Sequence, residues 1–260
     1  MRTLRSVAPS LVLVAAISLS IAGCGTDGAS SDRATQPVMT STPTQLSPVE
    51  KLVDAAAKTN QGPITVVLQS PGLTSTTKFD PAAKKATMDI ELAGATGGTI
   101  RANVIQVDTD LYVRMPNVPG VPKKWMHSDV ADLPADSPLR LLPESDHTRA
   151  GDLTNCVVTA KRKGGSDFTG TLDLTRSRTI GRALLTALDS KAKAVPFSAR
   201  TSPDGNFFEF TIDIPSVLPE YGAIRYDYSR MDGVDVDRPP ASQVTEVPEL
   251  PKSLLDGIAA

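Results

Sequence analysis

Few residues of this chain could carry out chemistry. Its 260 residues include two histidines and two cysteines, which leaves little material for nucleophilic or metal-dependent reactions. His127 and His147 lack the paired spacing and the acidic or cysteine partners of a metal site, so we expect both on the surface. The sequence contains no Gly-x-Ser-x-Gly elbow and no glycine-rich phosphate loop. We therefore expect a protein that is not an enzyme and that holds no metal or cofactor.

Cys24 is the one residue whose surroundings indicate a specific reaction. It follows an apolar run at residues 11–22, which is well short of the ~20 residues of a transmembrane helix. The sequence IAGC at residues 21–24 resembles a bacterial lipobox, in which the cysteine thiol receives a diacylglycerol. We expect residues 1–23 to be a lipoprotein signal peptide and the mature protein to be lipid-anchored on the extracytoplasmic face of the cell membrane.

The second cysteine and one basic run have simpler interpretations. Cys156 falls within a strand-like pattern and has no intrachain partner once Cys24 is acylated, so we expect a buried, unreactive thiol. The basic run at residues 161–163 lies at an expected hairpin tip, where charges keep a sheet edge from pairing with other chains. Contact with lipid headgroups is the alternative role for this run.

Charge and composition argue against two classes of binding protein. The chain has 27 basic and 29 acidic residues, a net charge of −2, so we expect no binding to nucleic acid through a positive field. Aromatic residues make up 4% of the chain, which supplies a surface of stacked rings poorly.

The chemistry-bearing residues are few, but the elements around them are well patterned. A capping box opens a helix at residues 48–60 with one apolar face. A second helix is predicted over residues 177–191 and a short third one over 137–142. Elsewhere apolar and polar side chains alternate, as in strands with one wet face. The predicted strands begin near residue 64 and include residues 85–92, 99–107, 110–115, 153–162, 167–174, 196–201, 206–214 and 223–230.

These elements predict an α+β fold. About ten adjacent, alternating strands favour a strongly bent antiparallel β-sheet, a half-barrel, with two or three helices over its concave face. The domain is expected to span residues 47–245. A lipidated cysteine and flexible tether (24–46), rich in Ser, Thr, Gly and Pro, precede it. A C-terminal tail (246–260) follows, and the chain after Met231 is expected to be irregular.

The apolar face of such a sheet is wider than the helices that cover it. The sheet must then curl around a solid core or leave an apolar hollow that suits acyl chains, and the pattern leaves both arrangements open. Strand alternation and helix periodicity give the candidate lipid-binding residues: Leu52, Met88, Ile90, Leu92, Ile100, Ala102, Val104, Leu172, Leu174, Leu184, Leu188, Phe208, Phe210 and Ile212.

The order of these features resembles a known family. The lipobox cysteine, the tether, the opening helix, the strand at residues 110–114 (DLYVR) and the stretch at 124–127 (KWMH) followed by Ser137-Pro138-Leu139 are similar to the LppX/LprA/LprF/LprG lipoproteins of actinobacteria. The resemblance covers roughly residues 47–245 and implies a fold like that of the LolA and LolB carriers. It also implies a short helix near residue 137, a pocket for multi-acylated envelope lipids and no enzymatic activity. The proline-rich loop at residues 115–122 departs from the family pattern, so the identity of the ligand is not carried over.

We therefore expect a membrane-anchored extracytoplasmic lipoprotein, a monomer, that binds acylated envelope lipids of glycolipid or acylglycerol type and helps transport them. Its partners would be those lipids and an envelope lipid transporter. The alternative is a surface-anchored scaffold or adaptor protein without a ligand cavity. A hydrolase of envelope lipids is a third option.

Overall fold

The computed structural model describes residues 45–93, 98–134, 137–143 and 146–247. Contacts between residues divide the chain into residues 1–43 and residues 44–260. Everything described below belongs to the second unit, which contains the whole buried core of the described chain.

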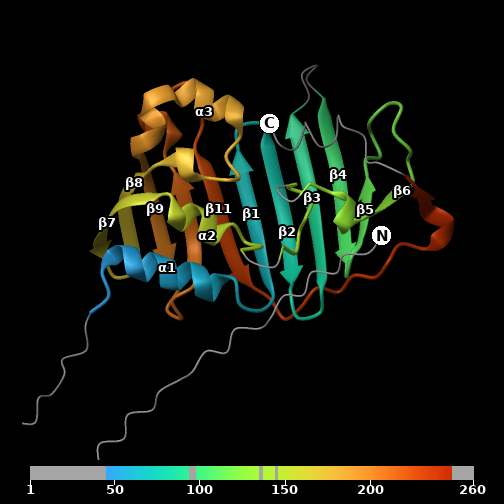
Figure 1. Cartoon of the computed structure of the whole chain (residues 1–260), viewed down its shortest axis with the longest axis horizontal. Coiled ribbons are helices and arrows are strands. Elements are labelled where there is room, and N and C mark those ends of the chain that lie inside the picture. The colour runs from blue at the N-terminus through green and yellow to red at the C-terminus, as the bar shows by residue number, and fades with distance from the viewer. Residues whose placement is uncertain (1–44, 94–97, 135–136, 144–145, 248–260) are drawn as a thin grey trace, which may run out of the picture. The chain divides into compact units, whose positions relative to one another are not determined.

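A single sheet of twelve strands organises this unit (Figure 1). Its hydrogen-bonded order is β12-β6-β5-β4-β3-β2-β1-β11-β10-β9-β8-β7. The strands are β1 (Ile64–Ser70), β2 (Leu73–Asp80), β3 (Lys85–Ala93), β4 (Thr99–Val107), β5 (Asp110–Arg114), β6 (Trp125–Asp129), β7 (Val157–Gly164), β8 (Asp167–Leu172), β9 (Val195–Thr201), β10 (Phe207–Ile212), β11 (Ile224–Arg230) and β12 (Val244–Glu246).

The predicted α+β class is confirmed, and the sheet is open because its end strands β7 and β12 do not pair with each other. The prediction of a purely antiparallel sheet is wrong at one place. β12 pairs with β6 in parallel, because the chain after Met231 returns to the sheet edge rather than staying irregular throughout. The pattern gave no sign of a strand this short.

Local sequence sets the first helix. α1 (Pro48–Thr59) begins where the amide of Glu50 donates to Ser47 Oγ at 3.3 Å and the amide of Ser47 donates to the Glu50 carboxylate at 2.7 Å. This is the predicted capping box. The fully buried Leu52 lies on the side of the helix that faces the sheet. Arg230 of β11 donates to carbonyl oxygens of the last turn, which lack intrahelical partners at any helix end.

The second predicted helix, residues 177–191, is much shorter than its pattern. Only α3 (Arg182–Leu188) is α-helical. The carboxylate of Asp152 accepts hydrogen bonds from Ser177 Oγ at 2.6 Å and Thr179 Oγ1 at 2.9 Å. This distant carboxylate holds the segment before α3 in a non-helical conformation. Five short 3-10 helices accompany the α-helices: η1 (Val130–Asp132), η2 (Leu174–Arg176), η3 (Asp189–Ala194), η4 (Ile214–Ser216) and η5 (Ala241–Gln243).

The predicted helix at residues 137–142, including the short helix implied by the family resemblance, is wrong. The segment is irregular, because the side-chain oxygen of Gln106 accepts hydrogen bonds from the amides of Leu141 and Leu142 at 3.0 and 3.2 Å. Those amides therefore need no helical partners. The segment lies over the inner side of β4, where Gln106 is almost fully buried.

The third helix lies where a strand was predicted, at residues 153–162. α2 (Ala150–Asn155) occupies the first part of that range, and β7 begins only at Val157. The Asp146 carboxylate accepts hydrogen bonds from the amides of the first turn, from Gly151 at 2.7 Å and from Asp152 at 2.6 Å. This side chain provides the amides at the start of α2 with acceptors.

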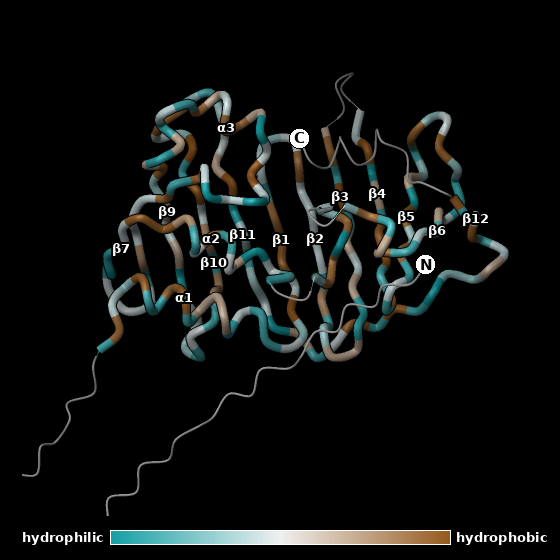
Figure 2. Tube along the Cα trace, in the orientation of Figure 1, coloured by the Kyte–Doolittle hydropathy of each residue, from teal (hydrophilic) through white to brown (hydrophobic). Residues whose placement is uncertain are grey.

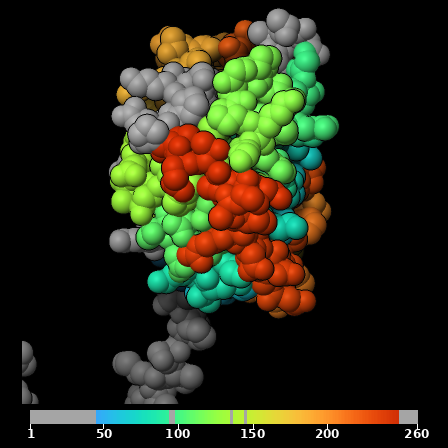
Figure 3. Space-filling model, turned by 90° about the vertical axis from the view of Figure 1, so that its right-hand side faces the viewer, coloured from blue at the N-terminus to red at the C-terminus, as the bar shows by residue number. Residues whose placement is uncertain are grey.

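The core lies on one side of the sheet, here called the inner face. Three helices lie over its β7-to-β1 part, and irregular chain at residues 133–134, 137–143 and 146–149 lies over β2 to β5 (Figure 1). Apolar residues recur along the strands in Figure 2, as strand alternation requires. The opposite, outer face is mostly polar. Residues 231–247, here called the C-terminal strap, contact this outer face and finish beside β6 (Figure 3).

Candidate lipid-binding face and the polar network behind it

Most of the predicted lipid-binding residues share the inner face. Registers across the sheet place them at matched positions, for example Met88 opposite Val104 and Ile90 opposite Ala102. The fully or nearly fully buried members of the set are Leu52, Met88, Ile90, Ala102, Val104, Leu172, Leu174, Leu188, Phe210 and Ile212. The half-buried members are Leu92, Ile100 and Leu184.

Phe208 is the exception, and the prediction that it shares the inner face is wrong. Its side chain is 49% exposed, whereas its neighbour Phe207 is 2% exposed. A register irregularity in the pairing of β10 with β9, between Phe207 and Glu209, inserts one residue and reverses the alternation. Phe208 therefore lies on the outer face, with the Arg200 guanidinium 5.1 Å from its ring centre. Simple alternation through this strand could not have found the bulge.

Within the described residues, one end of the inner face is only partly covered. Leu73 pairs with Leu92, and Leu92 pairs with Ile100, so these aliphatic side chains form a row across β2, β3 and β4. All three, and Leu68 on β1, are partly buried and pack against the core. We call these four residues the apolar rim. α3 lies at the same end of the sheet (Figure 1) and adds its own half-buried Leu184.

The inner face itself is filled by protein side chains. Two cavities stand out among the described residues, with volumes of about 320 and 390 Å³. The first lies at the opposite end of the sheet from the apolar rim, beside Gln106, Leu142 and His147. The second lies on the outer face. Val104 is the only member of the predicted lipid-binding set that lines either of them.

Buried groups on the inner face are not poised for chemistry. The expected burial of Cys156 is confirmed. Burial raises the pKa of its thiol to about 12, and its Sγ donates to the carbonyl oxygen of Asp152 at 3.3 Å. Cys156 lies at the end of α2, not within a strand. Burial also raises the pKa of Tyr226 to about 12. Such groups stay neutral at physiological pH.

The predicted surface position of His147 is wrong. Its side chain packs edge-on against Phe79, with ring centres 5.2 Å apart, and is buried. Burial lowers the pKa of His147, so it packs as a neutral ring. The basic run at residues 161–163 is exposed on β7, the strand at one edge of the sheet, as the edge-protecting role requires.

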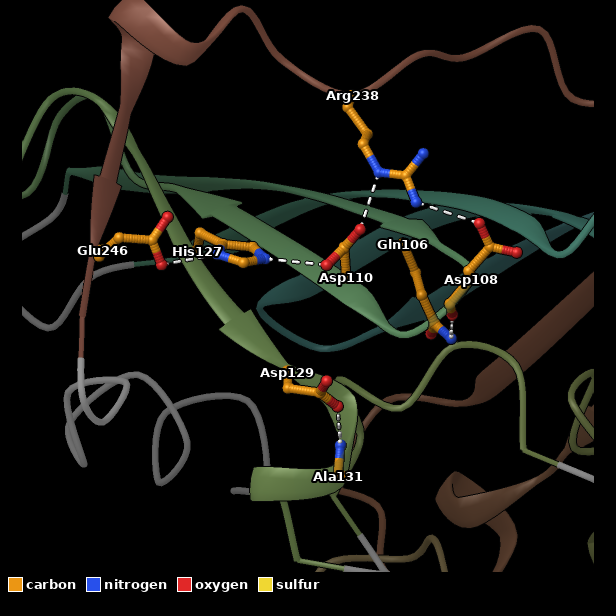
Figure 4. A network of polar contacts seen from close by, with 8 residues as sticks. All are labelled: Gln106, Asp108, Asp110, His127, Asp129, Ala131, Arg238 and Glu246. Carbon is orange, nitrogen blue, oxygen red and sulfur yellow. Dashed lines mark hydrogen bonds and ion pairs between the residues drawn. The ribbon is translucent and has the colours of Figure 1, made fainter.

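His127 belongs to a polar network that no sequence pattern indicated (Figure 4). Its Nδ1 lies 2.7 Å from Glu246 Oε2, and its Nε2 lies 3.1 Å from Asp110 Oδ1. Arg238 donates from Nε to Asp110 at 2.7 Å and from Nη2 to Asp108 at 3.1 Å. Because Arg238 and Glu246 lie on the C-terminal strap, the network joins the strap to the turn between β4 and β5 and to β6.

The charges in this network reinforce one another. Burial acts to lower the pKa of His127, but its contacts with Glu246 and Asp110 outweigh that effect, and the pKa is raised. The hydrogen bond from Arg238 lowers the pKa of Asp110 despite partial burial. The imidazole has carboxylates on both sides, and the network includes no nucleophile. The arrangement therefore fastens the strap to the sheet.

Among the described residues, no group of three or more His, Cys, Asp or Glu side chains could hold a metal ion. Within the same residues, no helix has the length and hydrophobicity needed to cross a bilayer. The predicted lipidation site Cys24, the signal peptide and the tether up to residue 44 lie outside the described residues, as does the chain after residue 247.

No protein-family model matches this chain, and no curated protein is significantly similar to it in sequence.

Proposed function

We propose that this protein is a membrane-anchored extracytoplasmic lipoprotein that binds acylated envelope lipids against the inner face of its sheet and helps transport them. The observation that carries the proposal is the apolar rim. Four aliphatic side chains on adjacent strands lie half-buried at one end of the inner face and continue directly into its core. The end of an acyl chain placed there would meet apolar side chains that lead toward the core.

The proposal includes a strongly bent sheet, a half-barrel whose concave side is the inner face. All three helices lie on that side (Figure 1), and the rest of the described cover is irregular chain at residues 133–134, 137–143 and 146–149. Asn60 at the end of α1 joins the two pieces of the cover through hydrogen bonds with Asp146 and Thr148, at the end of the sheet away from the rim. Parting the two pieces at the rim end would open the inner face between them without breaking a strand pair. The rim lies at one end of this seam and would be the entrance.

The driving force would come from burying methylene groups. Each methylene removed from water contributes about 0.8 kcal/mol, so an acyl chain of about sixteen carbons supplies roughly 12 kcal/mol before the cost of opening the cover. The side chains that fill the inner face must move apart to admit it. Binding by this route therefore selects an opened conformation of the unit.

Lipid transfer from vesicles tests this proposal. Residues 44–260 are incubated with vesicles that carry a fluorescent diacylglycerol or glycolipid, and the lipid that co-elutes with the protein is quantified by mass spectrometry. The variant Ile100→Asn places an amide in the entrance and should reduce the bound lipid severalfold. Val158→Asn, a matched change at an exposed aliphatic side chain of β7, should leave it unchanged. Equal loading of both variants would contradict the rim as entrance.

Anchoring is tested separately from binding. The full chain with Cys24→Ala is expressed in the organism of origin, and membrane and soluble fractions are compared by immunoblot. We expect the variant to leave the membrane fraction after a high-salt wash, because a polar tether alone has no membrane affinity. Retention of the variant on the membrane would refute lipidation at this cysteine while leaving the binding proposal intact.

The second candidate is a surface-anchored scaffold or adaptor without a ligand cavity. It is favoured by the filled inner face, where Ala102 and Val104 are each 1% exposed. Ala102→Trp separates the two candidates. A face that opens for lipid tolerates the ring and loses lipid binding, whereas a permanently packed core loses about 1–3 kcal/mol of unfolding free energy. Loss of stability together with absence of lipid in the wild-type protein would select the adaptor.

The proposal also includes the absence of catalysis. Esterase, glycosidase and transferase assays with envelope lipids should give no turnover. A rate that disappears when a single serine or histidine is replaced would instead support the hydrolase.

A further inference from the structure

A polar ladder crosses the outer face of the sheet on four adjacent strands. Asp89 of β3 pairs with Asn103 of β4, and Asn103 pairs with Arg114 of β5. Asn103 Nδ2 donates to Asp89 Oδ1 at 2.6 Å, and Arg114 Nη2 donates to Asn103 Oδ1 at 3.4 Å. The guanidinium of Arg114 lies over the ring of Trp125 on β6, 4.5 Å from its centre. Each side chain of the ladder thus orients the next.

A cavity of about 390 Å³ lies over this ladder. Its other wall is formed by the C-terminal strap, and Lys78 of β2 and Thr87 of β3 extend the polar lining. The remaining lining residues belong to β4 and the strap: Val104, Ile105, Met231, Gly233, Val234 and Asp235. This volume is at the small end of the range of small-molecule sites. The strap therefore makes a half-open pocket from what would otherwise be a flat polar sheet face.

An unused hydrogen-bond donor lies behind the lining of the cavity. Arg114 Nε is buried and has no acceptor among the described residues. A buried donor without a partner is costly, and a guanidinium N–H more so than a neutral one. The guanidinium keeps this orientation because it packs on the ring of Trp125 and because its Nη2 donates to Asn103 Oδ1. The oxygen of a ligand would satisfy this donor if the guanidinium turned toward the cavity.

The charged side chains of the lining indicate the chemical class of the ligand. The lining offers two cationic side chains, Lys78 and Arg114, and two carboxylates, Asp89 and Asp235, so its formal charge is zero. Inorganic phosphate would satisfy Arg114 Nε but would lie beside both carboxylates. Hydroxyl groups both donate and accept, and a set of adjacent hydroxyls matches a wall on which donors and acceptors alternate.

We propose that this cavity binds a sugar residue through its hydroxyl groups. The site depends on hydrogen bonds rather than ring stacking, because Arg114 already covers the face of Trp125. The scarcity of aromatic residues in the chain therefore does not argue against sugar binding at this cavity. The cavity lies on the opposite side of the sheet from the apolar rim, so its sugar is not the headgroup of a lipid held on the inner face. The inference is independent of the proposed lipid binding.

The chain carries its own reporter for this site. Trp125 is the only tryptophan in the sequence, and it lines the cavity. Residues 44–260 are titrated with mannose, galactose, arabinose and glucose, and the tryptophan emission is followed, with calorimetry as a second readout. We expect a saturable change at millimolar concentrations with at least one of these sugars. Absence of a saturable signal with all four would overturn the inference.

Two matched variants locate the binding. Asp89→Asn keeps the shape of the side chain but removes a charged acceptor, and should weaken sugar binding about tenfold. Glu91→Gln makes the same change two residues along the outer side of β3, where Glu91 pairs with Arg101 outside the cavity, and should bind as the wild type does. Equal affinity of the two variants for sugar would overturn the assignment to this cavity.

Other ligands test the chemistry. Inorganic phosphate and L-alanine should produce no saturable change, and tighter binding of either than of any sugar would replace the sugar with an anion or a zwitterion. An alkyl glucoside below its micelle concentration is compared with free glucose to separate a lipid-linked source from a free one. Similar affinities support a site for the sugar alone. Binding of the alkyl glucoside only would overturn the inference.

Discussion

The inner face of this sheet is covered in two different ways. From β7 to β1 it lies beneath three helices and an aromatic core, in which Phe197 and Phe210 stack with ring centres 5.1 Å apart. From β2 to β5 it lies beneath residues 133–134, 137–143 and 146–149, none of them α-helical, and the C-terminal strap is fastened to the other side by ion pairs. Both parts have a buried core, since Leu111, Val113 and Met126 are as fully buried as Phe210. The first part adds packed α-helices to that core, and the second adds exposed ion pairs to the strap.

The difference indicates where the unit can open. Burial of large apolar side chains stabilises by several kcal/mol each, whereas exposed ion pairs contribute little. We therefore expect the helix-covered part to be the stable platform, and the strap, which exposed ion pairs fasten to the sheet, to move first. Four predictions test this comparison.

The largest effect is expected in the helix-covered part. Phe207→Ala should lower the free energy of unfolding by about 3–5 kcal/mol, because it empties a buried aromatic site. Phe208→Ala should cost less than about 1 kcal/mol, because the neighbouring ring lies on the outer face and half of it is exposed. Urea unfolding of both variants measures the contrast. Equal losses would mean that the bulge in β10 is misplaced.

A buried polar contact in the same part should have an intermediate effect. Asp152 is 8% exposed and accepts hydrogen bonds from Ser177, Arg178 and Thr179. Asp152→Ala leaves these donors unpaired and should cost about 1–3 kcal/mol. The same variant should increase the amide hydrogen exchange of α3, since the segment before that helix loses its anchor. A stable variant with unchanged exchange would show that α3 is positioned by its apolar contacts alone.

Removing the two ion pairs that Arg238 makes should have only a local effect. Arg238→Ala breaks both of its ion pairs, with Asp108 and Asp110, yet the urea midpoint should not move measurably because these groups are exposed. Amide exchange in β12 should become faster. A large fall in the urea midpoint would mean that the strap is part of the core and would remove the contrast between the two parts.

The smallest effect is the pH dependence of the strap. Since the pKa of His127 is raised on folding, its contribution is complete below the unfolded pKa of about 6.5. It is lost as the pH rises through the folded pKa. The lowered pKa of Asp110 acts in the other direction, and its contribution is lost as the pH falls through that lower value.

The strap should therefore be held most firmly at about pH 5–6. Exchange protection of the β12 amides, corrected for intrinsic rates, should decrease by about 0.5 kcal/mol from pH 6 to pH 8. In His127→Gln this decrease should disappear. A pH dependence that persists in the variant would assign the titration to another group.

Much of the strand content was predictable because a strand's period of two is a local property. Met88, Ile90, Ala102 and Val104 were assigned to one face from alternation alone, and the structure places them on one buried face. The start of α1 was equally predictable, since its capping box lies within four residues of sequence.

Part of the candidate site could not be predicted, because partners distant in the chain decide it. Phe208 faces outward because the register with β9 shifts, and no feature of β10 itself reveals that shift. His127 was assigned to the surface without partners, since Glu246 lies 119 residues away. The outer cavity was missed for the same reason, because its walls come from five strands and the strap.

The sequence by itself determined the alternation that separates an apolar from a polar side in most strands, the capped first helix and the α+β class. Only the tertiary structure decided where alternation breaks, how short α3 is and that β12 joins β6 in parallel. The physical reason is the separation along the chain over which each interaction acts. Periodicity and capping act within one turn or one strand, whereas register, the Asp152 and Gln106 contacts and the path of the strap depend on which distant segments meet.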